Sequence, residues 1–324
     1  MEITPSRLRQ LMTTFNGDYR MGYSSAGPWW PRLLMRVPSS SSQNDYGWMA
    51  ALPKMREWLG ERVIQNLDAY SYQLKNKTYE ETVGVKREDI LDDNLGLYTP
   101  LFQEFGRSVA KHPDELALSL LQNGQNDTIY DNQHFFDTSH PVSLNAPDRT
   151  TPGGASVQSN YFTSTPLTQA NFQKVRATMM SYCDEGGRPL GIVPDLLWCG
   201  PALEPIARRI LLADTITEAV SNAAGTDFVG GAAAYNVTKG QGDVLCIPEL
   251  AGGAANVYDK TWGLACTTRF VKGLVFQDRE PDTFVQLANL TDHNVFMRRE
   301  FLYGAHNRRN VGYGLWWMMS KCTG

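Results

Sequence analysis

Residues 99–124 read TPLFQEFGRSVAKHPDELALSLLQNG, a stretch that predicts one long helix. A Thr-Pro pair at its start and an Asn-Gly pair at its end are favourable helix boundaries. Its apolar side chains recur at helical spacing: Leu101, Phe105, Val109, Leu116 and Leu120. Pro113 should kink or break the helix at His112, because proline lacks an N–H and disfavours helix in the residue before it. A helix of about 25 residues is well above the globular average and is expected to brace an elongated subunit.

The first 45 residues predict an arm rather than a domain. Thr4-Pro5 marks the start of a helix, and Asn16-Gly17 marks its end. The next segment, GPWWPRLLMRVPSSSSQND, mixes aromatic residues with three prolines and a run of serines. Such a segment cannot fold alone, so Trp29 and Trp30 are expected to be buried, either against the same chain or against a neighbouring one.

Residues 46–85 predict a second appendage. They begin in an apolar stretch around Trp48 and Trp58 and continue into the strand-like segment YSYQLKNKTY at 70–79. A strand this polar is a poor core strand. It is typical of one arm of an extended hairpin that projects and lies over a partner.

The rest of the chain alternates between helices and strands. Thr168 and Pro201 each predict the start of a helix with one buried face. Buried strands are predicted at 192–199 and 244–247, and a late strand at 294–303. The sequence therefore predicts a mixed α+β protein with two extended appendages near its N-terminal end.

Composition excludes several classes of protein. Of the 324 residues, 42% are hydrophobic and 20% are charged, which is enough apolar material to bury a core and excludes a disordered chain. No stretch reaches the roughly 18 uncharged apolar residues of a membrane-spanning helix, and the N-terminus lacks the apolar core of a signal peptide. The five cysteines are widely spaced without a CxxC motif, which favours buried thiols in a reducing compartment.

The net charge of −4 hides an uneven distribution. Residues 1–44 carry five Lys/Arg against two Asp/Glu, and residues 259–324 carry nine against six. Residues 45–258 carry sixteen against twenty-six. Basic ends on an acidic middle suit contact with nucleic acid or with an acidic neighbouring subunit, although solvated charge without a partner explains them equally well.

No catalytic, cofactor-binding or phosphate-binding motif stands out. The chain lacks HExxH, GxSxG, SxxK and phosphate-loop patterns. His134, Asp137 and His140 in HFFDTSHP have a ligand-like spacing, but a structural turn explains them better than a metal site. The sequence therefore predicts a protein that is not an enzyme and holds no metal or cofactor. A metal-dependent hydrolase built on these three residues is the minor alternative.

Five segments resemble the major head subunit of Mu-like tailed bacteriophages, which has the Hong Kong 97-type capsid fold. They are YGWMAALPKMREWLGERVIQNL (46–67), VKREDILDDNLGLY (85–98), FFDTSHPV (135–142), GRPLGIVPDLLWCGPALEPIARRIL (187–211) and REFLYGAHNRRNVGYGLWW (299–317). The order of the predicted elements also agrees with that fold: an arm, a hairpin, a long helix, an α+β body and late strands.

The resemblance implies a division of the chain into four parts. Residues 1–45 would be an N-terminal arm, and residues 46–85 an extended loop that lies on the adjacent subunit. The peripheral domain with its spine helix would take 86–124 and 268–305, and the axial domain 125–267 and 306–324.

The resemblance also implies a function and partners. Hexamers and pentamers of such subunits form an icosahedral shell around double-stranded DNA, held by non-specific contact, in a virion assembled in the host cytoplasm. Scaffold, portal and decoration proteins are implied partners, and a membrane is not. Because the arm begins almost at Met1, any scaffold is expected to be a separate protein. The alternative within the same fold is an encapsulin-like nanocompartment shell, which would hold a protein cargo instead of DNA.

Candidate intersubunit contacts follow from residue type, because aromatic and arginine side chains dominate interface energies. The candidates in the arm, the hairpin and the late strands are Trp29, Trp30, Trp48, Trp58, Arg62, Arg298 and Arg299.

The substitution Trp58→Ala is expected to lower the yield of assembled shells while the isolated subunit stays folded. A large aromatic side chain outside the core stabilises contacts with a neighbour and contributes little to the subunit itself. Electron microscopy measures the first quantity and circular dichroism the second. Shells of normal form at wild-type yield would contradict the prediction.

Overall fold

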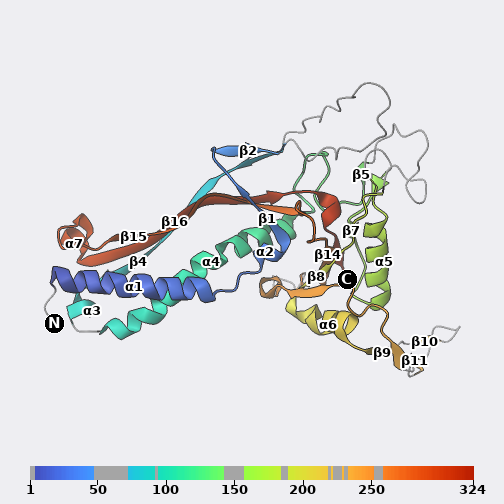
Figure 1. The fold of residues 1–324 in the computed structure, drawn as a ribbon, viewed down its shortest axis with the longest axis horizontal. Helices are drawn as coiled ribbons and strands as arrows, with labels where there is room; N and C mark the ends of the chain where they lie inside the picture. The colour runs from blue at the N-terminus through green and yellow to red at the C-terminus, as the bar shows by residue number, and fades with distance from the viewer. Residues whose placement is uncertain are drawn as a thin grey trace, which may run out of the picture. The chain divides into compact units, whose positions relative to one another are not determined.

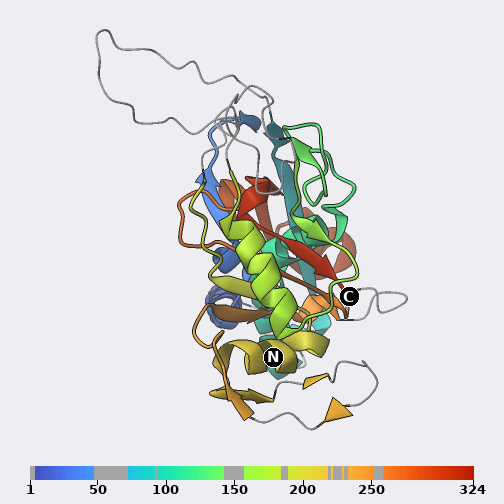
Figure 2. The same ribbon diagram turned by 90° about the vertical axis from the view of Figure 1, so that its right-hand side faces the viewer.

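The computed structural model describes residues 4–46, 72–91, 94–141, 157–183, 189–217, 220–221, 228–229, 233–251 and 258–324. They form two compact units, each built from segments far apart in the sequence (Figures 1 and 2). Unit 1 lies within 1–45, 73–119 and 275–312, and unit 2 lies within 46–72, 120–274 and 313–324. No helix among the described residues is long and apolar enough to cross a membrane.

Unit 1 is built on a four-stranded sheet with the strand order β1-β15-β16-β4. Its strands are β1 (Leu34–Pro38), β15 (Leu274–Leu287), β16 (Glu300–Tyr313) and β4 (Lys77–Lys86). The short helix α7 (His293–Arg298) connects β15 to β16 (Figure 1). The predicted strand at 294–303 is therefore wrong in its first half, because the chain uses a helical turn there to pass from β15 to its neighbour in the sheet.

The strand β4 forms one edge of this sheet. It pairs antiparallel with β16, from Lys77 opposite Arg309 to Lys86 opposite Glu300. Most of its side chains are exposed, as an edge strand allows, which accounts for its polar sequence. Residues 77–86 therefore do not project as the predicted hairpin does. Residues 47–71 of that hairpin lie outside the described residues.

The helix α1 (Pro5–Ser25) packs into the core of unit 1. As predicted, Thr4 caps its start and accepts the N–H of Arg7 at 3.4 Å. The predicted end at Asn16-Gly17 is wrong, because burial of Tyr19 outweighs the roughly 1 kcal/mol that a glycine costs inside a helix. The first helix is thus part of the body of its own chain rather than a detached arm.

The backbones of α1 and α4 (Tyr98–Asn123) touch at two glycines. A Cβ atom on Gly22 would lie 1.9 Å from the carbonyl oxygen of Gln103, and one on Gly106 would lie 2.0 Å from that of Tyr19. Figure 1 shows α4 passing beside α1. Because no side chain fits between the helices at these points, both positions require glycine.

The buried face of α4 differs from the predicted one. Leu101 is exposed, and Leu116 and Leu120 are only partly buried. The buried face combines large with small side chains: Phe102, Phe105, Gly106, Val109, Ala110, Ala117 and Leu121. Small residues belong to this face because the backbone of α1 comes so close, and a search for large apolar residues cannot find them.

Pro113 lies inside α4 without ending it. Proline has no N–H to donate to the carbonyl four residues earlier, which is that of Val109. Arg309 supplies a donor, since its Nη2 lies 3.3 Å from the Val109 oxygen. The same guanidinium forms a buried ion pair with Asp282 at 2.6 Å. The predicted break at His112 is therefore absent, because a distant strand satisfies the carbonyl that Pro113 leaves unpaired.

Unit 2 contains a five-stranded mixed sheet in the order β13-β8-β14-β17-β7. Its strands are β13 (Asp243–Cys246), β8 (Leu196–Cys199), β14 (Thr261–Ala265), β17 (Lys321–Thr323) and β7 (Tyr161–Phe162). Two of them, β8 and β13, fall within or near the predicted strands and pair in parallel. β8 is buried as predicted but begins at Leu196, whereas β13 is only partly buried because it lies at the edge of the sheet.

Two helices accompany this sheet, α5 (Gln169–Met180) and α6 (Glu204–Leu212). Thr168 caps α5 as predicted, and α6 follows a 3₁₀ turn that begins at Pro201. Figure 2 shows α5 in front of the strands of the sheet. The apolar face of α6, formed by Ala207, Ile210 and Leu211, is buried as its spacing predicts.

Short elements complete the described parts of both units. In unit 1 they are α2 (Trp30–Leu33), α3 (Arg87–Leu91), β2 (Gln43–Asp45) and β3 (Gln73–Lys75). In unit 2 they are β5 (His140–Pro141), β6 (Val157–Gln158), β9 (Thr215–Thr217), β10 (Val220–Ser221), β11 (Phe228–Val229) and β12 (Ala233–Tyr235). The strands of these short elements form two-stranded ladders, β2 with β3, β5 with β6, β9 with β12 and β10 with β11.

The substitution Gly106→Ala is expected to destabilise the chain by about 1–3 kcal/mol or more, because its Cβ would collide with the backbone of α1. Gly17→Ala is the matched control, since it also lies in a helix but its Cβ would meet nothing within 4 Å. This control should be neutral or stabilising by up to about 1 kcal/mol. Urea unfolding of the two variants measures the difference. Equal unfolding free energies would contradict the close approach of the helices.

Candidate functional site

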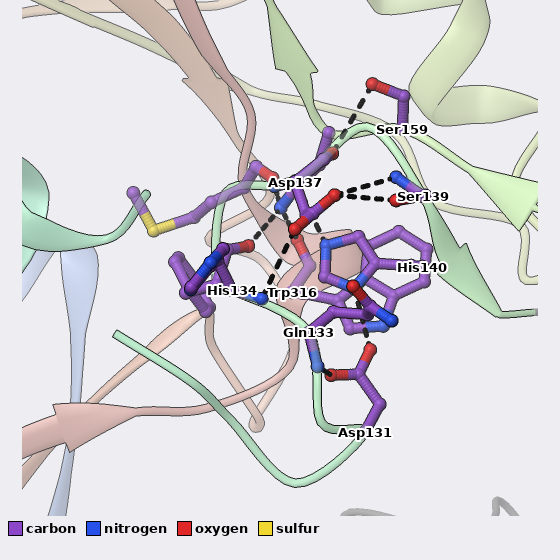
Figure 3. Close-up of polar contacts among 11 residues, drawn as sticks. Asp131, Gln133, His134, Asp137, Ser139, His140, Ser159 and Trp316 are labelled. Atoms are coloured by element: carbon purple, nitrogen blue, oxygen red, sulfur yellow. Dashed lines mark hydrogen bonds and ion pairs between the residues drawn. The ribbon is translucent and has the colours of Figure 1, made fainter. Parts of the chain in front are cut away.

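Figure 3 shows a cluster of polar side chains in unit 2, in the loop that follows α4. The carboxylate of Asp137 closes a turn of this loop. Its Oδ1 accepts the backbone N–H of Ser139 at 3.0 Å and the Ser139 hydroxyl at 2.9 Å, and its Oδ2 accepts the N–H of His134 at 3.4 Å. Burial disfavours the ionised form of Asp137, but these hydrogen bonds outweigh it and lower the pKa of the carboxyl below its usual value.

His140 lies at the centre of this cluster with 0% of its surface exposed. Its Nδ1 is 2.7 Å from Oδ2 of Asp131, and its Nε2 is 3.2 Å from Oδ1 of Asn160. The imidazole stacks on the indole of Trp316, with the ring centroids 4.0 Å apart and the planes 3° from parallel (Figure 3). Both ring nitrogens are therefore occupied by protein groups.

Asn160 joins this loop to the C-terminal segment. Its Nδ2 donates to the carbonyl oxygens of Phe135 at 2.8 Å, Trp316 at 3.1 Å and Met319 at 3.2 Å. No sequence motif points to Asn160 or Trp316, because their partners are mostly backbone groups from distant segments. The cluster is a structural joint inside unit 2.

The arrangement does not support the alternative of a metal-dependent hydrolase. A metal ligand needs a free lone pair on an imidazole nitrogen, and both nitrogens of His140 face other groups. Both carboxylate oxygens of Asp137 already accept hydrogen bonds from His134 and Ser139 in its own turn. Within the residues that the structure describes, no group of three or more His, Cys, Asp or Glu side chains is placed to hold a metal ion.

Lys321 closes the C-terminal end of α4. Its ammonium donates to the carbonyl oxygen of Leu121 at 2.7 Å and to Oε1 of Gln125 at 2.5 Å, and the residue is 2% exposed. A lysine near a helix C-terminus satisfies carbonyls that have no partner within the helix. Burial lowers the pKa of Lys321 to about 8.

The structure places Trp29 and Trp30 against their own chain. Their backbone N–H groups donate to the carboxylate of Asp114 at 3.3 Å and 2.8 Å, respectively. Trp29 is 7% exposed, and the ring of Trp30 packs against Phe276 with the centroids 4.5 Å apart. Of the two alternatives that the sequence leaves open, the structure shows burial in the same chain for Trp29, so little of it remains for a neighbour. Trp30 is only partly buried, and its contact with a neighbour stays a prediction.

Arg298 and Arg299 are exposed at the end of α7. Arg299 ends the helix in the left-handed conformation, with φ of 56°, and lies 3.2 Å from Glu88 in an exposed ion pair. The other three candidates, Trp48, Trp58 and Arg62, lie outside the described residues.

Exposed apolar side chains lie close to these arginines in the sequence, and the search for tryptophan and arginine missed them. We call this set the α7 patch. Its exposed members are Leu287, Leu290, Phe296 and Met297. Phe296 is 84% exposed and Met297 is 63% exposed. Neighbouring exposed apolar residues rimmed by charge are typical of a protein–protein contact.

Comparisons with known proteins agree with one another. A family model described as the Mu-like prophage major head subunit gpT matches residues 8–165, 148–229 and 233–323. The major capsid protein of Escherichia phage Mu is 32% identical over 324 residues, which cover 100% of this chain and 76% of that protein. The Mu-like prophage FluMu major head subunit of Haemophilus influenzae is 24% identical over 322 residues, which cover 99% and 75%.

A solved structure matches as well. The chain is similar to a subunit of the procapsid of bacteriophage JBD30, with a TM-score of 0.58 and 30% identity. The match covers 99% of this chain and 76% of that chain. The similarity therefore extends over both units.

The burial of Lys321 predicts a pH dependence of stability. An unfolded lysine keeps its proton to about pH 10.4, whereas the folded chain loses it near pH 8. Between these values the unfolded state binds more protons at this lysine, so the contribution of Lys321 to the unfolding free energy should rise with pH by at most about 1.4 kcal/mol per pH unit. Lys321→Met should lack this rise, while Lys260→Met, at an exposed position, should keep it.

Urea unfolding from pH 7 to pH 9.5 measures both curves. The tyrosines, and the cysteines whose pKa values are raised by burial, contribute equally to the variant and the control, so only the difference between the two slopes carries information. If the unfolding free energies of Lys321→Met and Lys260→Met changed with pH in parallel, the lowered pKa of Lys321 would be contradicted.

Proposed function

The chain belongs to the family of Mu-like prophage major head subunits and is a major capsid protein with the Hong Kong 97-type fold, and we propose that it assembles as hexamers and pentamers into an icosahedral phage head around double-stranded DNA. The observation that carries this proposal is the similarity of both units to a procapsid subunit over 99% of the chain. A shell subunit acts through the surfaces that contact its neighbours. The polar cluster around His140 is consistent with this role, because its groups form hydrogen bonds with one another.

In this assignment unit 1 is the peripheral domain, with α4 as its spine helix, and unit 2 is the axial domain. The late strands of the peripheral domain then run over 275–312 instead of 268–305, since β15 and β16 share a sheet with β1 and β4. The extended loop keeps the residues from 46 to 76, because 77–86 belong to the sheet. The arm of residues 1–45 becomes part of the peripheral domain.

The partners in this assignment are other copies of the chain, a scaffold, a portal, decoration proteins and packaged DNA. Assembly takes place in the host cytoplasm, and the finished subunit resides in the virion. The basic ends of the sequence support contact with DNA or with the acidic middle of another subunit. An encapsulin-like compartment is not favoured, because the family match is to phage head subunits.

Electron microscopy of the purified chain, at several protein and salt concentrations, tests the proposal. Shells, tubes or six-fold rings are the expected result, and DNA in shells recovered from producing cells supports a phage head. A protein cargo in place of DNA would favour the compartment. A chain that stays monomeric in the presence of the other head proteins of its phage would overturn the proposal.

The α7 patch provides a point substitution for the same test. Phe296→Ser is expected to raise the protein concentration needed for assembly by about tenfold or more, because burial of a phenylalanine contributes about 1.5–3 kcal/mol to a contact. Phe296→Leu keeps an apolar side chain and is the matched control. Both variants should unfold like the wild type, since the side chain is exposed in the subunit. Light scattering measures assembly, and equal threshold concentrations for the two variants would contradict a role for the patch.

A further inference from the structure

The two neighbours of the His140 ring are both hydrogen-bond acceptors. Nδ1 faces a carboxylate oxygen of Asp131, and Nε2 faces the amide oxygen of Asn160. A neutral imidazole carries one N–H and one lone pair, so it satisfies only one of these neighbours. In either neutral tautomer the remaining lone pair would point at another lone pair.

The orientation of the Asn160 amide is fixed by its other partners. Its nitrogen lies within 3.2 Å of three carbonyl oxygens, which accept hydrogen bonds and cannot donate them. Its oxygen lies 2.9 Å from the backbone N–H of Asp137. Rotating the amide by 180° would replace these attractive contacts with repulsive ones. Asn160 therefore presents an acceptor to Nε2, and Nε2 must carry a proton.

The contact with Asp131 places a second proton on the ring. The other oxygen of Asp131 accepts the N–H of Gln133 at 3.1 Å. A proton must lie between Nδ1 and Asp131 because their 2.7 Å separation is a hydrogen-bond distance. Imidazole is a stronger base than carboxylate, so this proton resides on the ring.

We propose that His140 is a buried imidazolium that locks the loop before β5 to the C-terminal segment around Trp316. The ion pair with Asp131 compensates the burial of the charge, and the parallel stack on Trp316 places the cation over an electron-rich ring. The proton on Nε2 holds the oxygen of the Asn160 amide. The nitrogen of that amide donates to the carbonyl oxygens of Trp316 and Met319.

The other titratable groups of the cluster are compatible with this charge. The backbone N–H of Asp137 donates to the same oxygen of Asn160 that faces His140, and hydrogen bonds within its own turn lower the pKa of its carboxyl. The phenol of Tyr182, whose ring packs edge-on against Trp316, stays neutral because burial raises its pKa. Loss of the second proton would leave a lone pair of His140 against Asp131 or Asn160. The joint is therefore complete only while both ring nitrogens carry protons, whether or not the chain forms shells.

Nuclear magnetic resonance of the full chain with ¹⁵N-labelled histidine tests this assignment. An unfolded histidine is about one-tenth protonated at pH about 7.5. His140, identified by the loss of its signals in His140→Gln, is expected to show protons on both ring nitrogens at that pH. A ring nitrogen of His140 without a proton at pH about 7.5 would overturn the proposal.

Two variants separate the charge from the fold. In Asp131→Asn the new amide can rotate and donate to Nδ1, so His140 should become neutral with its proton on Nε2. His134→Gln removes another imidazole of this loop, whose Nδ1 has no hydrogen-bond partner, and it should leave both protons in place. Two protons on His140 in a folded Asp131→Asn chain would contradict the role of the ion pair. These measurements use the unassembled chain, so a failure of the proposed function would leave their outcome unaffected.

Discussion

The close approach of α1 to α4 is the constraint on which unit 1 depends. Gly22 and Gly106 let the two backbones meet, with no room for a side chain between them. Because the helices come so close, Phe15 stacks on Phe102 with ring centroids 4.3 Å apart. Tyr303 then meets both rings edge-on from the sheet. A core of this kind needs segments from both ends of the chain, so unit 1 is expected to fold as one cooperative piece.

The second requirement is that α4 be supported at its weak points by distant residues. Pro113 leaves the carbonyl of Val109 without its helical partner, and Arg309 donates to it. The end of the helix leaves the carbonyl of Leu121 unpaired, and Lys321 donates to it. Unpaired buried carbonyls are costly, so these two cations let a helix of 26 residues run through a proline and end inside the protein. This arrangement buries two positive charges, those of Arg309 and Lys321. The ion pair of Arg309 with Asp282 and the hydrogen bonds of the Lys321 ammonium offset the free-energy cost of burying them.

A capsid subunit needs surfaces that meet copies of itself, held on a well-packed frame. The charged and polar groups of the described core serve the frame: Asp282 with Arg309, and His140 with Asp131 and Asn160. The exposed apolar side chains of the α7 patch are available for contact. The polar groups of the core thus serve structure, and the exposed apolar groups serve contact. This explains why a search for catalytic motifs finds only the structural turn at Asp137.

Much of the local structure was determined by the sequence itself. The caps at Thr4 and Thr168 and the buried strand β8 form as predicted, because capping and runs of apolar residues act over a few neighbouring positions. The family resemblance also holds, since it rests on patterns along nearly the whole chain.

The tertiary structure alone decided the rest. The sequence predicts that one helix ends near Gly17 and that Pro113 kinks or breaks the next, yet both helices continue because burial and a distant arginine outweigh the local cost. The polar strand β4 becomes a sheet edge because β16 is available to pair with it. Asn160 becomes the centre of a joint through contacts with residues far along the chain. Such outcomes depend on which distant groups meet, and a local pattern carries no information about its distant partners.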